Sequence, residues 1–206
     1  MSESDDFFQP DEGTKAKYEE GYRMLRLCTG ALEGLCSITI REEVRMQSVE
    51  ATTAIDPYDK NLVRAAYAMA DEVDLWSPDS LDQVHGVLYS DSPGMRDGAY
   101  EQLKDLFDKC FMSNLPMSML AAIAHNGILR IAPFEKGNGI IARMWYSELL
   151  GRSFKTFQYI SPEAEFLRTR EEYESLAADP DDIKGFVDYS LDCDREALSR
   201  LFGMLW

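Results

Sequence analysis

Apolar residues recur at steps of three and four along most of this chain, a spacing typical of amphipathic helices rather than of strands. The segment at residues 14–35 opens with such a stripe at Tyr18, Tyr22 and Leu25. Few stretches alternate apolar and polar residues with a period of two, so a sheet of any size is not expected. The pattern predicts an all-α fold of about eight helices, at residues 14–35, 41–55, 61–76, 77–89, 99–111, 116–134, 138–151 and 179–202.

The helix at residues 61–76 allows a more detailed prediction. Asn61 precedes its apolar run and is expected to cap the helix, because an amide oxygen accepts a hydrogen bond from a free N–H of the first turn. Four residues share one face, which is expected to point into the core: Leu62, Ala66, Met69 and Val73.

The length of 206 residues is sufficient for one domain with a substantial core. Residues 1–13 are acidic, so we expect a flexible N-terminus followed by a single helical domain over residues 14–206. This start is unlike a secretory signal, and no window approaches about eighteen consecutive apolar residues. The four cysteines form no C-x-x-C pair, so reduced, buried thiols in a cytoplasmic setting are expected.

The chain carries 37 acidic and 21 basic side chains, which give a formal net charge of −16. A field of this sign repels phosphate backbones and anionic lipid surfaces. Nucleic acid and membranes are therefore not expected as partners. The charge serves either solubility or the attraction of a basic protein surface, and the sequence leaves both open.

One short stretch, IAPFEKGNGIIAR at residues 131–143, places Gly137, Asn138 and Gly139 directly before an apolar helical run. These residue types tolerate positive φ, and consecutive backbone N–H groups in such a loop converge into a concave set of donors. The donors also lie at the positive end of the following helix, where an anion is favoured. The stretch predicts an anion-binding loop, with a helix-capping glycine followed by an ordinary turn as the alternative.

The wider region PMSMLAAIAHNGILRIAPFEKGNGIIARMW resembles the signature of the Fic family, whose motif reads His-Pro-Phe-x-Asp/Glu-Gly-Asn-Gly-Arg-x-x-Arg. Six positions match in register: Pro133, Phe134, Gly137, Asn138, Gly139 and Arg143. The segment LDQVHGVLYSDSPGMR is similar to the family's Leu-His helix and the Pro-Gly-x-x-Arg that follows it, and residues 160–191 resemble its closing helices. The resemblance covers roughly residues 40–195 and implies a Fic-like helical bundle.

This resemblance also implies a chemistry. Fic proteins transfer a nucleotide portion, usually AMP from ATP, onto a hydroxyl side chain of a target protein. In their motif the histidine is the general base, the acidic residue holds Mg²⁺, the glycine loop cradles the phosphates and two arginines neutralise them. The matching candidates for nucleotide binding are Phe134, Gly137, Asn138, Gly139 and Arg143.

Three motif positions that act in the family's reaction hold other residues in this chain. The histidine is replaced by Ala132, which accepts no proton. The metal ligand is replaced by Lys136, a cation that repels Mg²⁺, and the first arginine is replaced by Ile140. Glu135 is an acidic substitute, but it stands one residue out of register. No catalytic residue and no metal ligand can be assigned, and both a natural loss and an engineered Ala132 on a divergent motif remain open.

The chain has two histidines, and both match positions that the family fills for reasons other than catalysis. His85 belongs to the Leu-His helix, and His125 lies seven residues before the Ala132 position. Each is expected to be a core histidine with satisfied ring nitrogens.

Two further features of the family are altered. Only residues 97–100 separate Arg96 from the helical stretch EQLKDLF. This is too short for the β-hairpin flap that clamps target proteins in many Fic proteins, so the flap is expected to be shortened or absent. Residues 46–51, MQSVEA, weakly resemble the inhibitory helix, whose glutamate pairs with the second motif arginine. Glu50 would then pair with Arg143, and an exposed glutamate on an ordinary helix is the alternative.

Together these features predict a Fic-fold protein, derived from AMP transferases, that has lost transfer activity and acts as a nucleotide- or partner-binding module. Loss of a general base alone costs about 10²- to 10⁴-fold in rate. The alternative is an active transferase with altered chemistry. ATP is the candidate cofactor, and Mg²⁺ is not expected. A protein partner or target is expected.

Overall fold

The computed structural model describes residues 8–32 and 38–205. Within these ranges the chain forms ten α-helices and one short 3₁₀ helix, and no strand. The all-α prediction is confirmed, with two more helices than the sequence pattern predicted. The elements are α1 (Glu12–Leu32), α2 (Ile38–Ile55), α3 (Lys60–Ala70), α4 (Pro78–Leu88), α5 (Ala99–Met112), α6 (Met117–Ile131), α7 (Asn138–Ser153), η1 (Lys155–Tyr159), α8 (Pro162–Arg168), α9 (Arg170–Ala178) and α10 (Ile183–Leu205).

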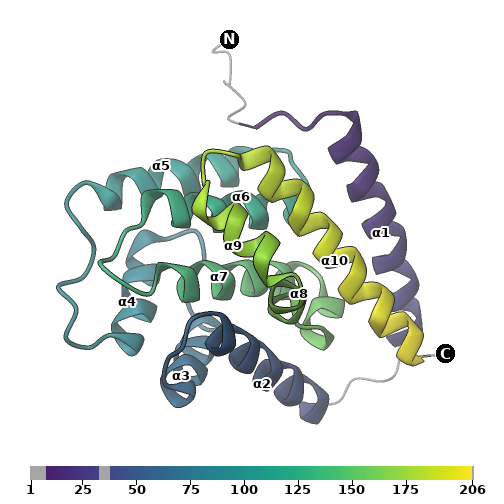
Figure 1. Ribbon diagram of the computed structural model, residues 1–206, viewed down its shortest axis with the longest axis horizontal. Helices are drawn as coiled ribbons and strands as arrows, with labels where there is room; N and C mark the ends of the chain where they lie inside the picture. Colours follow the sequence, from purple (N-terminus) through teal and green to yellow (C-terminus); the bar gives the residue numbers. More distant parts are fainter. Residues whose placement is uncertain (1–7, 33–37, 206) are drawn as a thin grey trace.

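Helices α6 and α7 pack against each other in the middle of the bundle, and the other helices cover them (Figure 1). The reason is in their sequences, because a helix that is apolar on all sides must be buried on all sides. Every residue from Ser118 to Ile128 of α6 is buried, and so is every residue from Ile140 to Tyr146 of α7. The short loop between the two helices is therefore fixed at both ends by the core.

The remaining helices surround this pair. Helix α1 lies along α10 on one side of the bundle, while α2 and α3 lie together on another (Figure 1). Helix α5 packs on α6, and α8 packs between α2 and α10. None of the helices in the described ranges combines the length and the apolar character needed to cross a membrane.

The N-cap predicted for α3 is wrong, and the predicted buried face is correct only at Ala66. Its N-cap is Asp59, whose carboxylate accepts hydrogen bonds from the N–H groups of the second and third residues of the helix, Asn61 and Leu62. Its buried face consists of Val63, Ala66, Tyr67 and Ala70, whereas Leu62 and Met69 are 39% and 36% exposed. The large ring of Tyr67 decides the orientation, because burying it removes more apolar surface than burying Met69 does.

The helical domain begins earlier than residue 14. Helix α1 starts at Glu12, and the N–H of Thr14 donates to the carboxylate of Asp11 at 2.8 Å. Phe8 is also buried. Of the segment expected to be flexible, only residues 1–7 lie outside the described ranges. The described cysteines, Cys28, Cys110 and Cys193, are buried and unpaired, and Cys36 lies outside those ranges.

A buried carboxylate joins four helical segments. Glu163, at the start of α8, is 0% exposed and accepts hydrogen bonds from Tyr67 of α3 and Ser147 of α7. Its second oxygen lies 2.9 Å from the Ser48 hydroxyl of α2 and 3.2 Å from the Ser161 hydroxyl. A charge at this depth is tolerated only because these hydroxyls replace its hydration.

We predict that Glu163→Ala destabilises the fold by about 3–5 kcal/mol, because it leaves several buried hydroxyls without an acceptor. The measurement is urea unfolding at neutral pH. The matched control is Glu171→Ala on α9, an exposed position that should change stability by less than about 0.5 kcal/mol. Equal effects of the two substitutions would contradict this role of Glu163.

Candidate functional site

The glycine loop between α6 and α7 is closed by its own asparagine. Ala132 ends α6 in the left-handed region at φ 46°, and Gly137 precedes α7 in the same region at φ 81°. The Asn138 side chain accepts from the Phe134 N–H at 3.0 Å and donates to the Phe134 carbonyl at 2.9 Å. The two bonds hold the intervening residues in one compact turn.

His85 supports this loop from α4. Its ring stacks face to face on Phe134, with centroids 3.6 Å apart and planes inclined by 1°. Its Nε2 lies 3.1 Å from the Lys136 carbonyl oxygen. Burial lowers the pKa of His85 below its usual 6.5, so the ring is neutral near pH 7 and donates to that carbonyl. The expectation of a structural histidine agrees with this arrangement.

His125 lies deeper, in an aromatic cluster. Its Nε2 lies 3.2 Å from the Tyr173 hydroxyl. Among the residues that the structure describes, its buried Nδ1 has no hydrogen-bond partner, so the expectation that both nitrogens are satisfied is wrong. Burial, with a smaller contribution from the charge of Arg143, lowers the pKa of His125 well below its usual value.

Arg96 holds the loop from outside the bundle. Its backbone N–H donates to the Pro133 carbonyl at 2.8 Å. Its guanidinium donates to the carbonyls of Ile131, at 3.0 Å, and Ala132. A cation on the last carbonyls of α6 is favoured, because the helix dipole places negative partial charge there.

The retained motif arginine, Arg143, is 1% exposed. Its Nη2 donates to Asp56 Oδ2 at 2.6 Å, and its Nη1 donates to the Tyr173 hydroxyl at 3.0 Å. Thr52 supplies two longer contacts at 3.4 Å, through its hydroxyl and its carbonyl. The charge of Arg143 is therefore neutralised within the protein by Asp56, the residue that follows α2.

The hypothesis that Glu50 pairs with Arg143 is wrong. Glu50 is exposed and its carboxylate lies 3.8 Å from Lys60 Nζ, a weak surface contact. Asp56 stands six residues further along the chain, just past the end of α2 at Ile55. No local pattern in the sequence marks Asp56, because its role comes from the packing of α2 beside α7.

Asp56 also lies against the first turn of α7. A Cβ atom added to Gly139 would stand 2.6 Å from Asp56 Oδ2, and one added to Gly137 would stand 2.2 Å from the Tyr89 ring. Two side chains of the protein thus cover the glycine loop at close range. No hydrogen bond forms between a described residue and the backbone N–H groups of residues 135–140. These N–H groups provide the donors that the loop could offer to an anion.

The three altered motif positions have structural surroundings of their own. Ala132 presents a methyl group at the end of α6. Lys136 extends its Nζ over the Tyr89 ring, 4.7 Å from the centroid, which is a cation–π contact. Ile140 is 2% exposed and belongs to the hydrophobic core. Neither a proton acceptor nor a metal ligand stands at these positions, and the one cation, Lys136, is exposed.

The segment that would carry a flap joins α4 to α5. Residues 89–98 form turns, with Gly94 and Gly98 at positive φ, and contain no strand. The expectation of a shortened or absent hairpin agrees with this connection.

A separate groove of about 770 Å³ lies between α2, α3, α7 and η1. Glu148 lines it, ten residues after the start of α7 and so roughly 15 Å from the glycine loop. Its carboxylate lies 3.3 Å from Arg45, which also pairs with Asp71 at 2.9 Å. Burial raises the pKa of Glu148 to about 8, helped by the charge of Asp71 and opposed by that of Arg45.

Comparison with models of protein families finds no match, and neither does comparison with the curated proteins. Solved structures do match. A Fic family protein from Desulfovibrio desulfuricans G20 is similar at a TM-score of 0.82 and 17% identity, over 96% of this chain and 76% of that one. Residues 134–508 of Fic-1 from C. elegans match at a TM-score of 0.64 and 20% identity, over 89% of this chain and 72% of that one. A variant of that segment matches at a TM-score of 0.62 and 20% identity, over 88% of this chain and 72% of that one.

These likenesses and the geometry together define a class of protein. The arrangement of helices in this chain is similar to that of proteins described as Fic, over 96% and 89% of its length. The chain therefore has the Fic fold.

We predict that Gly137→Ala destabilises the protein by about 2–4 kcal/mol, because a Cβ at positive φ is strained and would also displace the Tyr89 ring. Urea unfolding measures the change. Gly151→Ala on the same helix is the control, because its Cβ would meet only Gln158, at 3.7 Å, and alanine is the better helix former. A Gly137→Ala variant as stable as the control would contradict the described loop conformation.

We predict that Glu148→Gln stabilises the protein increasingly as pH rises. Between the usual pKa of 4.5 and about 8, the unfolded chain releases a proton that the folded chain keeps, so wild-type stability falls across this window. The gain should be small near pH 5 and about 5 kcal/mol near pH 9. Tm values of both proteins across this range measure it, with Glu72→Gln on the exposed rim as the control. A gain independent of pH would contradict the prediction.

Proposed function

We propose that this chain is a Fic-fold protein without adenylyl transfer activity, which acts as a binding module for a protein partner and admits a nucleotide only when Asp56 moves away. The observation that carries the proposal is the ion pair between Arg143 and Asp56 at the start of α7. An anionic side chain already occupies the region where the family resemblance places the phosphates.

The absence of transfer follows from the proton acceptors around the loop. Ala132 offers a methyl group, and the Nε2 of His85 is engaged by the Lys136 carbonyl. His125 is fully buried behind Arg143. Glu135 is exposed and forms no hydrogen bond or ion pair with a described residue, so nothing orients it toward the loop. An active transferase with altered chemistry is therefore the less favoured function.

The residues present do not fit Mg²⁺. A divalent cation needs several oxygen ligands, and within the described ranges no group of three or more His, Cys, Asp and Glu side chains is placed to hold a metal ion. Lys136 adds positive charge to the loop itself.

The loop fits a phosphate group better than a metal. The free N–H groups of residues 135–140 and the end of the α7 dipole favour an anion. Asp56 competes with that anion for Arg143, and the negative charge of Asp56 repels the anion. The net charge of −16 opposes a nucleotide over the whole surface and favours a partner with a basic surface.

We predict that Asp56→Ala binds ATP at least about tenfold more tightly than the wild type, because a charge-assisted bond to Arg143 becomes available to the phosphates. Isothermal titration calorimetry with and without Mg²⁺ measures the affinity. Glu50→Ala is the matched control, since it removes an acidic side chain of α2 that lies away from Arg143. Asp56→Asn, which keeps an acceptor for Arg143, tests the effect of charge in a variant with less loss of stability.

Transfer is measured separately with labelled ATP, the purified protein and a cell lysate. We expect no label on any protein from the wild type. Label that depends on Asn138 would overturn the proposal of a non-transferring module. Unchanged ATP affinity in both Asp56 variants would overturn the role given to Asp56.

A further inference from the structure

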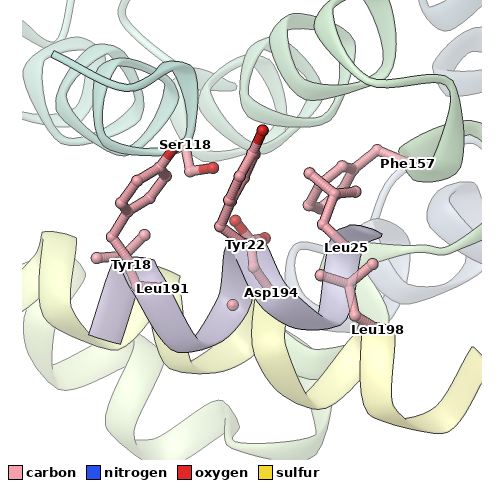
Figure 2. A pocket seen from close by; sticks show the side chains of 9 residues that line it. Tyr18, Tyr22, Leu25, Ser118, Phe157, Leu191, Asp194 and Leu198 are labelled. Atoms are coloured by element: carbon pink, nitrogen blue, oxygen red, sulfur yellow. The ribbon is translucent and has the colours of Figure 1, made fainter. Parts of the chain in front are cut away.

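A small pocket lies between α1 and α10, on the side of the bundle away from α3 and α4 (Figure 1). Figure 2 shows Tyr18 and Tyr22 projecting from α1 toward α6, where Ser118 lies, and Asp194 of α10 beside the base of Tyr22. The free volume is about 10 Å³, enough for the centre of a single water-sized group. No residue of the glycine loop takes part in this pocket.

The pocket contains a carboxyl group that is only half satisfied. Asp194 is 3% exposed, and its Oδ1 accepts from the Tyr146 hydroxyl at 2.8 Å. Its Oδ2 is buried and has no hydrogen-bond partner among the described residues. Buried carboxyl oxygens are rarely left without a partner, so an unpaired oxygen beside a cavity indicates a position for a donor.

The walls of the pocket suit a cation. The rings of Tyr18 and Tyr22 are stacked, with centroids 5.7 Å apart and planes inclined by 25°. Aromatic faces attract cations through their quadrupole, most strongly where water is excluded. Tyr22 is 40% exposed, so this wall continues from the buried carboxyl to the surface.

Gly21, which lies in the interior of the α1 sequence, lines the pocket. A glycine within a helix costs about 1 kcal/mol relative to alanine. A Cβ built on Gly21 would meet no atom within 4 Å, so packing does not require the glycine. The missing side chain instead leaves space between the tyrosines and Asp194.

We propose that this pocket binds a primary ammonium group on an unbranched aliphatic stem, with the ammonium on Asp194 Oδ2 and the stem passing Gly21 beside the two tyrosine rings. A free alkylamine and a lysine side chain share this chemistry. An ammonium is close to water in size, whereas a guanidinium or a quaternary ammonium exceeds the free volume. The net charge of −16 attracts any such cation.

Binding is coupled to a proton. Burial raises the pKa of Asp194 well above its usual value, so the empty pocket holds a neutral acid near pH 7. The other titratable groups facing it are the hydroxyls of Tyr18, Tyr22 and Tyr146, and burial raises the pKa of Tyr18 and of Tyr146. An arriving ammonium ion keeps its own protons and displaces the proton of Asp194 to the buffer. The product is a buried pair of carboxylate and ammonium.

The test is a titration of the full chain with n-butylammonium. Calorimetry in buffers of different ionisation enthalpy measures the binding and the proton release, and NMR monitors the tyrosine rings. We expect saturable binding, shifted Tyr18 and Tyr22 signals, and release of about one proton per amine. The neutral isostere 1-butanol should bind at least about tenfold more weakly, and so should tetramethylammonium. Titration with Nα-acetyl-lysine methylamide identifies the source: tighter binding than n-butylammonium indicates a lysine side chain, and weaker binding a free amine.

Two variants make the test specific. Asp194→Asn keeps the acceptor for Tyr146 but cannot become anionic, and it should weaken amine binding at least about tenfold. Gly21→Ala should weaken binding by blocking the space beside the rings, while raising Tm. Gly30→Ala, also in α1 with no atom within 4 Å of the added Cβ, should raise Tm and leave binding unchanged.

The proposal is overturned if neither amine binds saturably to the wild type, or if 1-butanol binds as well as n-butylammonium. Unchanged affinity in Gly21→Ala overturns it as well, and this variant carries the test if Asp194→Asn does not fold. None of these results depends on the behaviour of Asp56 or ATP.

Discussion

The charge of Arg143 is the constraint on which the centre of this protein depends. A guanidinium that is 1% exposed must be neutralised and hydrogen-bonded within the protein, because a buried charge without partners costs several kcal/mol. Asp56 supplies the charge, and Thr52 and Tyr173 supply further acceptors. These contacts join the end of α2 and the middle of α9 to α7. The position of α2 beside the glycine loop is therefore an electrostatic requirement as well as a result of packing.

The same arrangement limits what the loop does in the state described. Asp56 and Tyr89 cover it, the Asn138 side chain closes it, and the stacked ring of His85 supports it from below. A ligand that reaches Arg143 must displace a carboxylate that is already held at 2.6 Å. The half-exposed side chain of Asp56 makes such a displacement sterically simple, since the loop itself does not have to open.

The sequence predicted the elements whose pattern is local. The long apolar runs of α6 and α7 and the Gly-Asn-Gly turn between them are readable from residue order, because helix period and positive φ are local properties. Helices α8 and α9, of seven and nine residues, are too short to display a period, so only the family resemblance indicated helices in this region. Asp56 was missed because its role depends on a contact with Arg143, 87 residues away. Glu163 was missed for the same reason, since its partners come from separate helices.

The close fit around Gly137 has a consequence for how this chain changes over time. Gly137 and Asn138 are needed for folding alone, because Tyr89 leaves no room for a Cβ and the amide closes the turn. Selection for a folded chain is enough to keep them, with or without a nucleotide. Positions 132, 136 and 140 carry no comparable structural demand for the family's residues, so mutation is free to replace them first. The fold alone can thus preserve a glycine motif, whatever chemistry the loop performs.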